Sequence, residues 1–270
     1  MRESLSRLVT ALERSRTITL AALVAQIPFE FRYSFAGLSN LQWTFVLLVV
    51  VSLPLLLTNW RDFQKDRLAL GASLFVAVQW IASFYAPEFN GNAYKAAIRF
   101  TAGLLLLFIA RNASNQATVL RVWVIASFVA AAYALIAQAG FGETLFRNNE
   151  FFVGRVQRLS GSFEYPNVAA AYFAISLALV WRSAFRAAVR WAGALLLWSA
   201  LILTFSRGSA VAVLTILIAD ALLTWKKHGE WQRPVQAIVA AVIAAAIITA
   251  FSPVEARGFE VPAGFESFLR

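Results

Sequence analysis

Long apolar stretches constrain this chain more than any other feature of its sequence. A helix that crosses a bilayer needs about 20 predominantly apolar residues, because lipid offers no partner to loose backbone amides and carbonyls. About nine stretches meet or approach this length, at residues 17–36, 41–58, 68–86, 94–110, 119–140, 168–181, 191–205, 209–225 and 234–251. We therefore expect an all-α fold, a polytopic transmembrane helical bundle of about nine spans.

The composition agrees with a chain that lies in lipid. Charged residues make up 14% of the sequence, whereas an ordinary soluble domain has about 25%. The nine Trp suit rings anchored at the level of the lipid headgroups. The formal charge of +10 comes from short basic clusters between apolar runs, so we expect a bilayer and not a nucleic acid as partner. The absence of Cys excludes a disulfide framework and a thiolate metal site.

Lys and Arg are distributed unevenly between alternate connections. With the amino terminus in the cytoplasm, 15 of the 24 basic residues fall inside and the remaining nine outside, which predicts that orientation. Residues 1–16 then form a cytoplasmic amphipathic lead, residues 17–251 one transmembrane domain, and residues 252–270 the start of an extracytoplasmic loop. The longest connection, residues 141–167, lies outside. Its aromatic side chains predict that it rests on the membrane surface, and they are Phe146, Phe151, Phe152, Phe163 and Tyr165.

Several arginines fall on the outer side against this bias. Arg155 and Arg158 lie in the long connection, Arg207 lies between two apolar segments, and Arg99 lies near the outer end of the predicted span at 94–110. A guanidinium close to lipid requires an anionic or hydrogen-bonding partner, and its planar donors suit phosphate oxygens. We interpret the four arginines as one electropositive pocket. The alternative is that these side chains only anchor their segments at the headgroups.

Two short segments place two of these arginines beside residues with special backbone preferences. The first, RLSGSFEYPN at residues 158–167, precedes a helix rich in small residues, and the second, LTFSRG, occupies residues 203–208. Pro166 restricts the residue before it to extended geometry and suits the first turn of a helix, which Asn167 is expected to cap. Besides their arginines, the supporting residues of the two segments are Gly161, Phe163, Pro166, Asn167, Ser206 and Gly208. An ordinary loop-to-helix junction is the alternative for the first segment, and Gly208 is expected to permit a tight turn in the second.

Together the two segments resemble recurrent elements of the O-antigen ligase and O-antigen polymerase family, and the resemblance extends over residues 41–251. It implies a GT-C-like membrane domain and a glycosyltransferase that uses neither metal nor cofactor. Such an enzyme transfers a glycan from undecaprenyl diphosphate to a lipid or glycan acceptor at the extracytoplasmic face of the bacterial inner membrane. The resemblance implies that Arg158 and Arg207 hold the diphosphate of the donor. The charge pattern described above adds Arg155 and Arg99 to the same pocket.

The chain departs from the family pattern at the catalytic base. In the family a His in a large external loop after the last of these spans takes the proton from the acceptor. The single His of this chain, His228, lies in a Lys-rich connection predicted to be cytoplasmic, so it does not match and no catalytic residue is assigned. The large loop and the final spans are also missing, and we interpret the chain as the amino-terminal membrane portion of such an enzyme. Truncation is the favoured explanation, and a frameshifted gene product or a natural short form completed by a partner stays open.

Other functions stay open on sequence alone. A polymerase of polysaccharide repeat units belongs to the same family, and nothing in the sequence separates it from a ligase. A membrane transporter would carry buried charge at mid-membrane, whereas the ionisable residues here cluster at the outer rim. A non-catalytic membrane scaffold needs no base at all. The sugar, the acceptor and the oligomeric state have no sequence signal.

Overall fold

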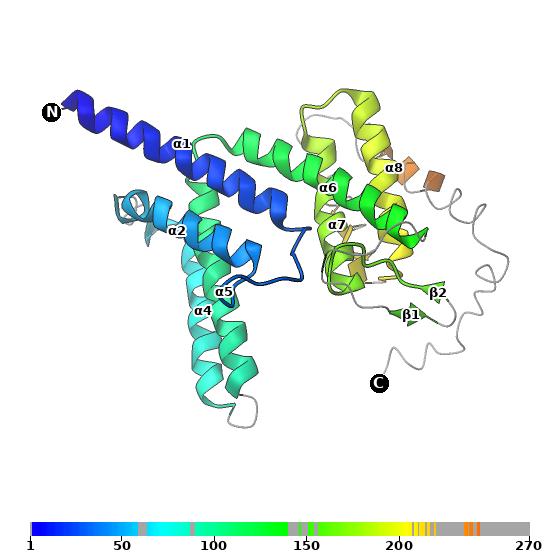
Figure 1. Ribbon diagram of the computed structural model, residues 1–270, viewed down its shortest axis with the longest axis horizontal. Coiled ribbons are helices and arrows are strands. Elements are labelled where there is room, and N and C mark those ends of the chain that lie inside the picture. The colour runs from blue at the N-terminus through cyan, green and yellow to red at the C-terminus, as the bar shows by residue number, and fades with distance from the viewer. Residues whose placement is uncertain are drawn as a thin grey trace. The chain divides into compact units, whose positions relative to one another are not determined.

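The computed structural model is mostly helical and falls into two compact units (Figure 1). It describes residues 2–58, 64–86, 90–139, 146, 151–153, 156–206, 208–209, 211–213, 215–216, 219, 235–236, 238–239 and 242–243. The predicted spans at 209–225 and 234–251 lie largely outside these residues. The amino-terminal unit comprises Met1–Val24 and Asn40–Val119, and the carboxyl-terminal unit comprises Ala25–Ser39 and Leu120–Arg270.

Four predicted spans are long helices in the structure. Within the described residues four helices are long and apolar enough to cross a membrane, namely α2 (Asn40–Thr58), α4 (Arg67–Phe84), α5 (Asn90–Arg111) and α6 (Gln116–Gln138). They indicate a membrane protein. Two shorter helices of 17 residues each, α7 (Pro166–Arg182) and α8 (Ala187–Leu203), occupy the predicted stretches at 168–181 and 191–205.

The first predicted span is wrong in its extent. Helix α1 runs from Arg2 to Gln26, so it passes without a break through position 16 and ends well short of residue 36. Pro28 explains the end, because a proline disfavours helical geometry in the residue before it and cannot donate a backbone hydrogen bond. Beyond the helix, residues 31–38 take part in isolated antiparallel β-bridges, one of them between Phe35 and Leu38.

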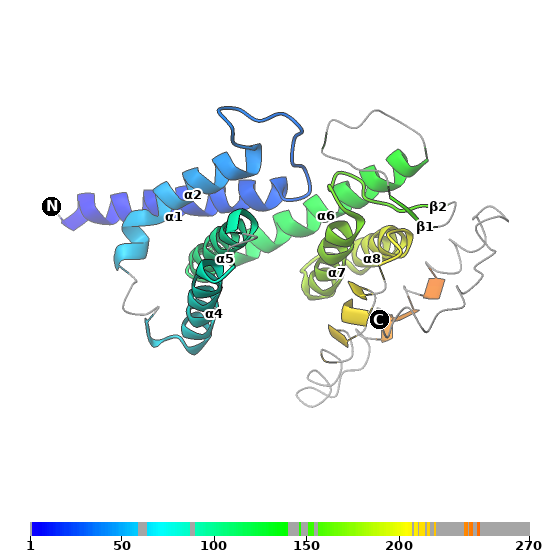
Figure 2. The same cartoon turned by 90° about the horizontal axis from the view of Figure 1, so that it is seen from below.

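Helices α4 and α5 of the amino-terminal unit form an antiparallel pair (Figures 1 and 2). Trp80 Nε1 donates to Thr101 Oγ1 at 2.9 Å, and the rings of Phe75 and Phe100 meet edge to face at 5.0 Å. Helix α2 adds fewer contacts to α5 and leaves an apolar surface uncovered by protein. Its exposed side chains include Leu47, Val50, Leu53 and Leu57. Such a surface is suited to lipid.

Helix α6 contributes Val124, Ala130, Ala131 and Ala134 to the core that it shares with α7 and α8 in the carboxyl-terminal unit. Trp123 on α6 donates from Nε1 to Ser176 Oγ on α7 at 2.9 Å and stacks on Tyr172 with ring centres 5.4 Å apart. Gly193 on α8 lets the ring of Phe128 approach, because an added Cβ would lie 2.0 Å from its Cζ. A short antiparallel hairpin, β1 (Phe152–Val153) and β2 (Val156–Gln157), precedes α7.

Candidate functional site

The segment that follows the hairpin connects the ends of two helices in the carboxyl-terminal unit. Gln157 O accepts from Gln138 Nε2, in the last turn of α6, at 2.9 Å. Leu159 N donates to Leu203 O, the last residue of α8, also at 2.9 Å. The backbone N–H of Arg158 donates to Phe151 O at 2.7 Å, which continues the pairing of the hairpin by one residue. Arg158 is therefore fixed by its backbone between α6 and α8.

The side chain of Arg158 joins the two sequence elements. Its Nε donates to the backbone oxygen of Thr204 at 2.8 Å, and its Nη2 donates to Asn167 Oδ1 at 2.7 Å. Asn167 belongs to the first element and Thr204 to the second, although 35 residues, 168–202, lie between the two segments. Both acceptors are neutral, and Arg158 makes no ion pair among the described residues. Its positive charge is therefore not cancelled by a carboxylate in this part of the chain.

Gly161 forms the turn that returns the chain from Arg158 to α7. Its φ is +61°, in the left-handed region that favours glycine. The turn is closed by Phe163 N, which donates to Ser160 O at 3.0 Å. A Cβ on Gly161 would lie 2.5 Å from the Cβ and 3.2 Å from the Cα of Ala134 on α6. Both the backbone angle and the lack of space require glycine at this position.

The start of α7 differs in one respect from the sequence prediction. Tyr165 is extended, with φ −131° and ψ 139°, and Pro166 occupies the first turn, as predicted. The predicted cap by Asn167 is wrong, because Tyr165 is the N-cap and its side chain makes no capping hydrogen bond. Asn167 lies one residue inside the helix, where its amide oxygen accepts from Arg158 instead.

The end of α8 also corrects a prediction. The residue with a left-handed backbone there is Phe205, with φ +51°, and not Gly208. An added Cβ on Gly208 would meet nothing within 4 Å among its neighbours. Ser206 N donates to Thr204 Oγ1 at 3.2 Å, and Ser206 Oγ donates to Ser209 Oγ at 3.1 Å. The turn is therefore built on Thr204 to Ser206, with Thr204 fully buried.

The aromatic residues of the long connection do not share one environment. Phe163, predicted on the membrane surface, is buried in the core, where its ring contacts Tyr172 and Phe173 at 5.2 and 5.9 Å. Phe146 pairs with Phe31 through its backbone and stacks on its ring at 5.7 Å. Phe152 and Tyr165 are exposed, as a surface location requires. The prediction was wrong for Phe163 because residues 159–163 form the buried turn beside α6.

The structure brings together only part of the predicted pocket. Arg158, Asn167 and the turn at Ser206 lie at one place, and Gly161, Phe163 and Pro166 support it from the core. Arg155 and Arg207 lie outside the described residues, as does His228. Arg99 is exposed on α5 of the amino-terminal unit, and its membership in the same pocket stays a prediction.

Sequence reasoning missed the two backbone contacts that hold Arg158 in place. Thr204 acts through its carbonyl oxygen and Gln138 binds a carbonyl, and a backbone acceptor leaves no signal in residue type. Within the described ranges, no three His, Asp or Glu side chains come close enough to hold a metal ion. The arrangement that remains is a cation beside the amino-terminal end of a helix.

Comparison with protein-family models, with curated proteins and with solved structures finds no match for this chain.

Proposed function

We propose that the chain is a lipid-linked glycan transferase of the O-antigen ligase kind, and that Arg158 binds the diphosphate of its undecaprenyl-linked donor. One observation supports this most. The two segments that carry the family resemblance meet at Arg158, whose guanidinium bonds Asn167 in the first and Thr204 in the second. A resemblance read from two separate segments gains weight when the same side chain contacts both.

The chemistry of the site suits an anion. The positive charge of Arg158 is not compensated by its described acceptors, which are an amide oxygen and a carbonyl oxygen. A guanidinium has five N–H donors, and these two bonds use two of them. The nearby start of α7 has no side-chain cap, and uncapped helix amides favour negative charge. In the proposal Arg207, Arg155 and Arg99 add positive charge, and the leaving diphosphate is neutralised as its bond to the sugar breaks.

The proposed donor site requires a particular membrane topology. The bundle has about nine spans, the amino terminus is cytoplasmic, and the site opens at the extracytoplasmic face of the bacterial inner membrane. A reporter fused after Arg155 should therefore report an extracytoplasmic position. A cytoplasmic signal from that fusion would remove a donor site at the outer face.

A scaffold is the second candidate, and the same two hydrogen bonds favour it. In that case Arg158 only clamps the start of α7 to the end of α8. The two functions predict different behaviour for Asn167→Asp. A carboxylate there would still accept from Arg158, so the clamp stays, but it would cancel the charge that an anionic donor needs.

The test is binding of an undecaprenyl diphosphate analogue to the purified protein in detergent. Arg158→Ala and Asn167→Asp should each weaken binding by about tenfold or more, since a charge-assisted contact is worth about 1.5–3 kcal/mol. Arg158→Lys should rescue poorly because a lysine cannot bind phosphate in a bidentate way. Arg186→Ala, at an exposed arginine before α8, is the matched control and should bind like the parent. If Asn167→Asp keeps both stability and full binding, the donor site is wrong and the scaffold is favoured.

A further inference from the structure

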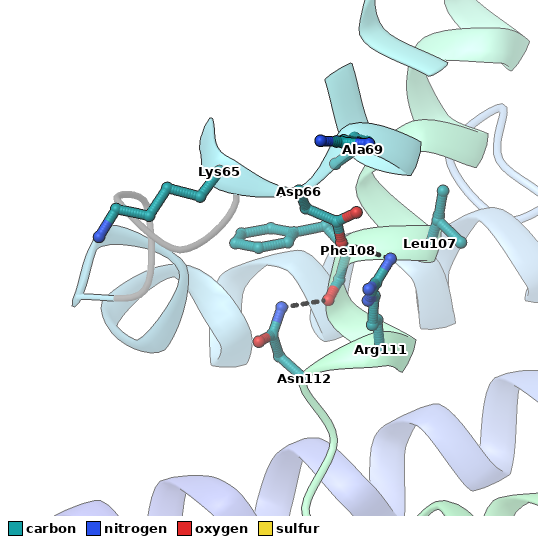
Figure 3. A pocket seen from close by; sticks show the side chains of 8 residues that line it. Lys65, Asp66, Ala69, Leu107, Phe108, Arg111 and Asn112 are labelled. Carbon is teal, nitrogen blue, oxygen red and sulfur yellow. Dashed lines mark hydrogen bonds and ion pairs between the residues drawn. The ribbon is translucent and has the colours of Figure 1, made fainter. Parts of the chain in front are cut away.

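A basic cavity lies in the amino-terminal unit, where α4 begins and α5 ends (Figure 3). It has a volume of about 430 Å³, and its lining includes Lys65, Asp66, Arg67, Phe108, Arg111 and Asn112. In Figure 3 the side chains of Asp66 and Arg111 face one another and form an ion pair. Asn112 is turned to the backbone of α5, where its Nδ2 donates to Phe108 O at 2.9 Å.

The cavity has an excess of positive charge. Its lining has three cationic side chains and one carboxylate, Asp66, which is already paired with Arg111 and accepts from Leu68 N at 2.9 Å as the cap of α4. Neither Lys65 nor Arg67 makes an ion pair within the described ranges. An anion that enters the cavity therefore meets positive charge that no carboxylate of the described residues compensates.

A buried guanidinium lies beside the lining. Arg16 on α1 is 0% exposed, and its Nη2 donates to the backbone oxygen of Asn112 and to Glu13 Oε1. Its Nε and Nη1 have no partner among the described residues. A buried cation with unsatisfied donors is costly unless an anion or a polar group compensates it. This residue links α1 to the same cavity lining.

The position of the cavity indicates that the anion belongs to a lipid. Both α4 and α5 are helices long and apolar enough to span a membrane, and the cavity lies at the end that they share. That end is at headgroup level when the helices span a bilayer. The surface beside it is apolar and exposed, with Leu68 at 60% and Leu107 at 36% exposure, which suits acyl chains. Free phosphate would contact only the basic residues and not this apolar surface.

We propose that this cavity binds the phosphate group of an anionic lipid headgroup, with the acyl chains along α4 and α5. The proposal does not depend on donor binding at Arg158, which lies in the other unit. Basic pockets between membrane helices bind anionic headgroups through charge and gain about fivefold in affinity from each Lys or Arg near the surface.

The experiment measures binding of short-chain phosphatidylglycerol to the purified protein by native mass spectrometry, with phosphatidylcholine of the same chains as reference. The double variant Lys65→Gln, Arg67→Gln should weaken phosphatidylglycerol binding by about 25-fold and leave phosphatidylcholine unchanged. Asp66→Asn should strengthen it, because asparagine still caps α4 but removes the negative charge. Arg186→Gln, outside the cavity, is the control and should equal the parent.

Competition with sodium phosphate, at ionic strength matched by sodium chloride, separates the two sources of phosphate. Phosphatidylglycerol that stays bound in phosphate as in chloride supports a lipid site. Displacement beyond the chloride effect by phosphate at a concentration no higher than that of the lipid would overturn the lipid as ligand, because the acyl chains would then add no affinity. Equal binding of the two lipids would overturn it as well. Unchanged binding in the double variant, with helical content and elution volume equal to the parent, would overturn the cavity as the site.

Discussion

Two helices of nearly equal length, α4 and α7, are buried to very different degrees. Helix α7 of the carboxyl-terminal unit buries ten of its 17 residues, whereas α4 of the amino-terminal unit buries three of 18. The helical glycines follow the same division. A Cβ on Gly71 or Gly103 would meet nothing within 4 Å, but one on Gly193 would collide with Phe128. Helix α7 packs within its own unit, whereas α4 leaves most of its surface exposed, which suits lipid.

The arginines of the two units follow this division. Arg158 is half-buried and held by two neutral oxygens, whereas Arg111 is 51% exposed and paired with a carboxylate. A charge held by neutral groups remains available to a ligand. An exposed ion pair contributes little to stability, so the positive charge of the amino-terminal cavity comes mainly from its other basic residues.

The largest effect is expected from alanine at Gly161. The left-handed backbone and the contact with Ala134 should together lower the free energy of unfolding by about 3 kcal/mol. Gly103→Ala, on an open helix surface, should change it by less than about 1 kcal/mol, in the stabilising direction. Denaturant unfolding of both variants in detergent measures the difference. Equal effects would contradict the contrast in packing.

The sequence predicts features that belong to a single helix better than contacts between distant segments. The apolar lengths predicted α2, α4, α5 and α6 closely, because backbone satisfaction in lipid is a property of each helix alone. They did not predict that α1 combines the lead with part of the first span. Nothing in residues 2–26 breaks a helix, so the amphipathic and apolar parts fold as one.

The candidate site was only half predictable. Arg158 and Asn167 were identified by type and spacing, but their hydrogen bond was not, because Asn167 was expected to cap α7. The carbonyl of Thr204 and the wall that Ala134 forms against Gly161 depend on packing between distant segments. The basic residues around Arg111 were interpreted as an orientation signal. The cavity that they line forms only through the packing of α4 against α5, which the sequence alone does not reveal.

A smaller contrast is expected between two arginine substitutions. Arg158→Ala should lower the free energy of unfolding by about 2 kcal/mol, since the carbonyl of the buried Thr204 loses a charged donor. Arg111→Ala should cost less than about 1 kcal/mol. Repeating the unfolding curves in high salt should remove the Arg111 effect and leave that of Arg158. Equal salt sensitivity would mean that Arg158 is no better shielded than Arg111.

The smallest contrast concerns the two helix starts. Asp66 caps α4, so Asp66→Ala should cost about 1 kcal/mol and Asp66→Asn only a few tenths. Asn167 does not cap α7, so Asn167→Ser, which keeps a capping side chain but shortens the reach to Arg158, should be no milder than Asn167→Ala. Thermal unfolding of the four variants measures both. If serine at position 167 were less destabilising than alanine, residue 167 would cap α7, which would contradict the assignment of Tyr165 as the N-cap.

The site at Arg158 requires that the two sequence elements meet, and a thiol crosslink tests this contact directly because the chain has no Cys. Leu159 N and Leu203 O are 2.9 Å apart, which brings the two residues within reach of a disulfide or a short crosslinker. A chain with Leu159→Cys and Leu203→Cys should crosslink rapidly on oxidation. The matched pair Leu159→Cys with Val189→Cys, at the other end of α8, should not. Crosslinking of the second pair as fast as the first, or of neither, would contradict the site at Arg158.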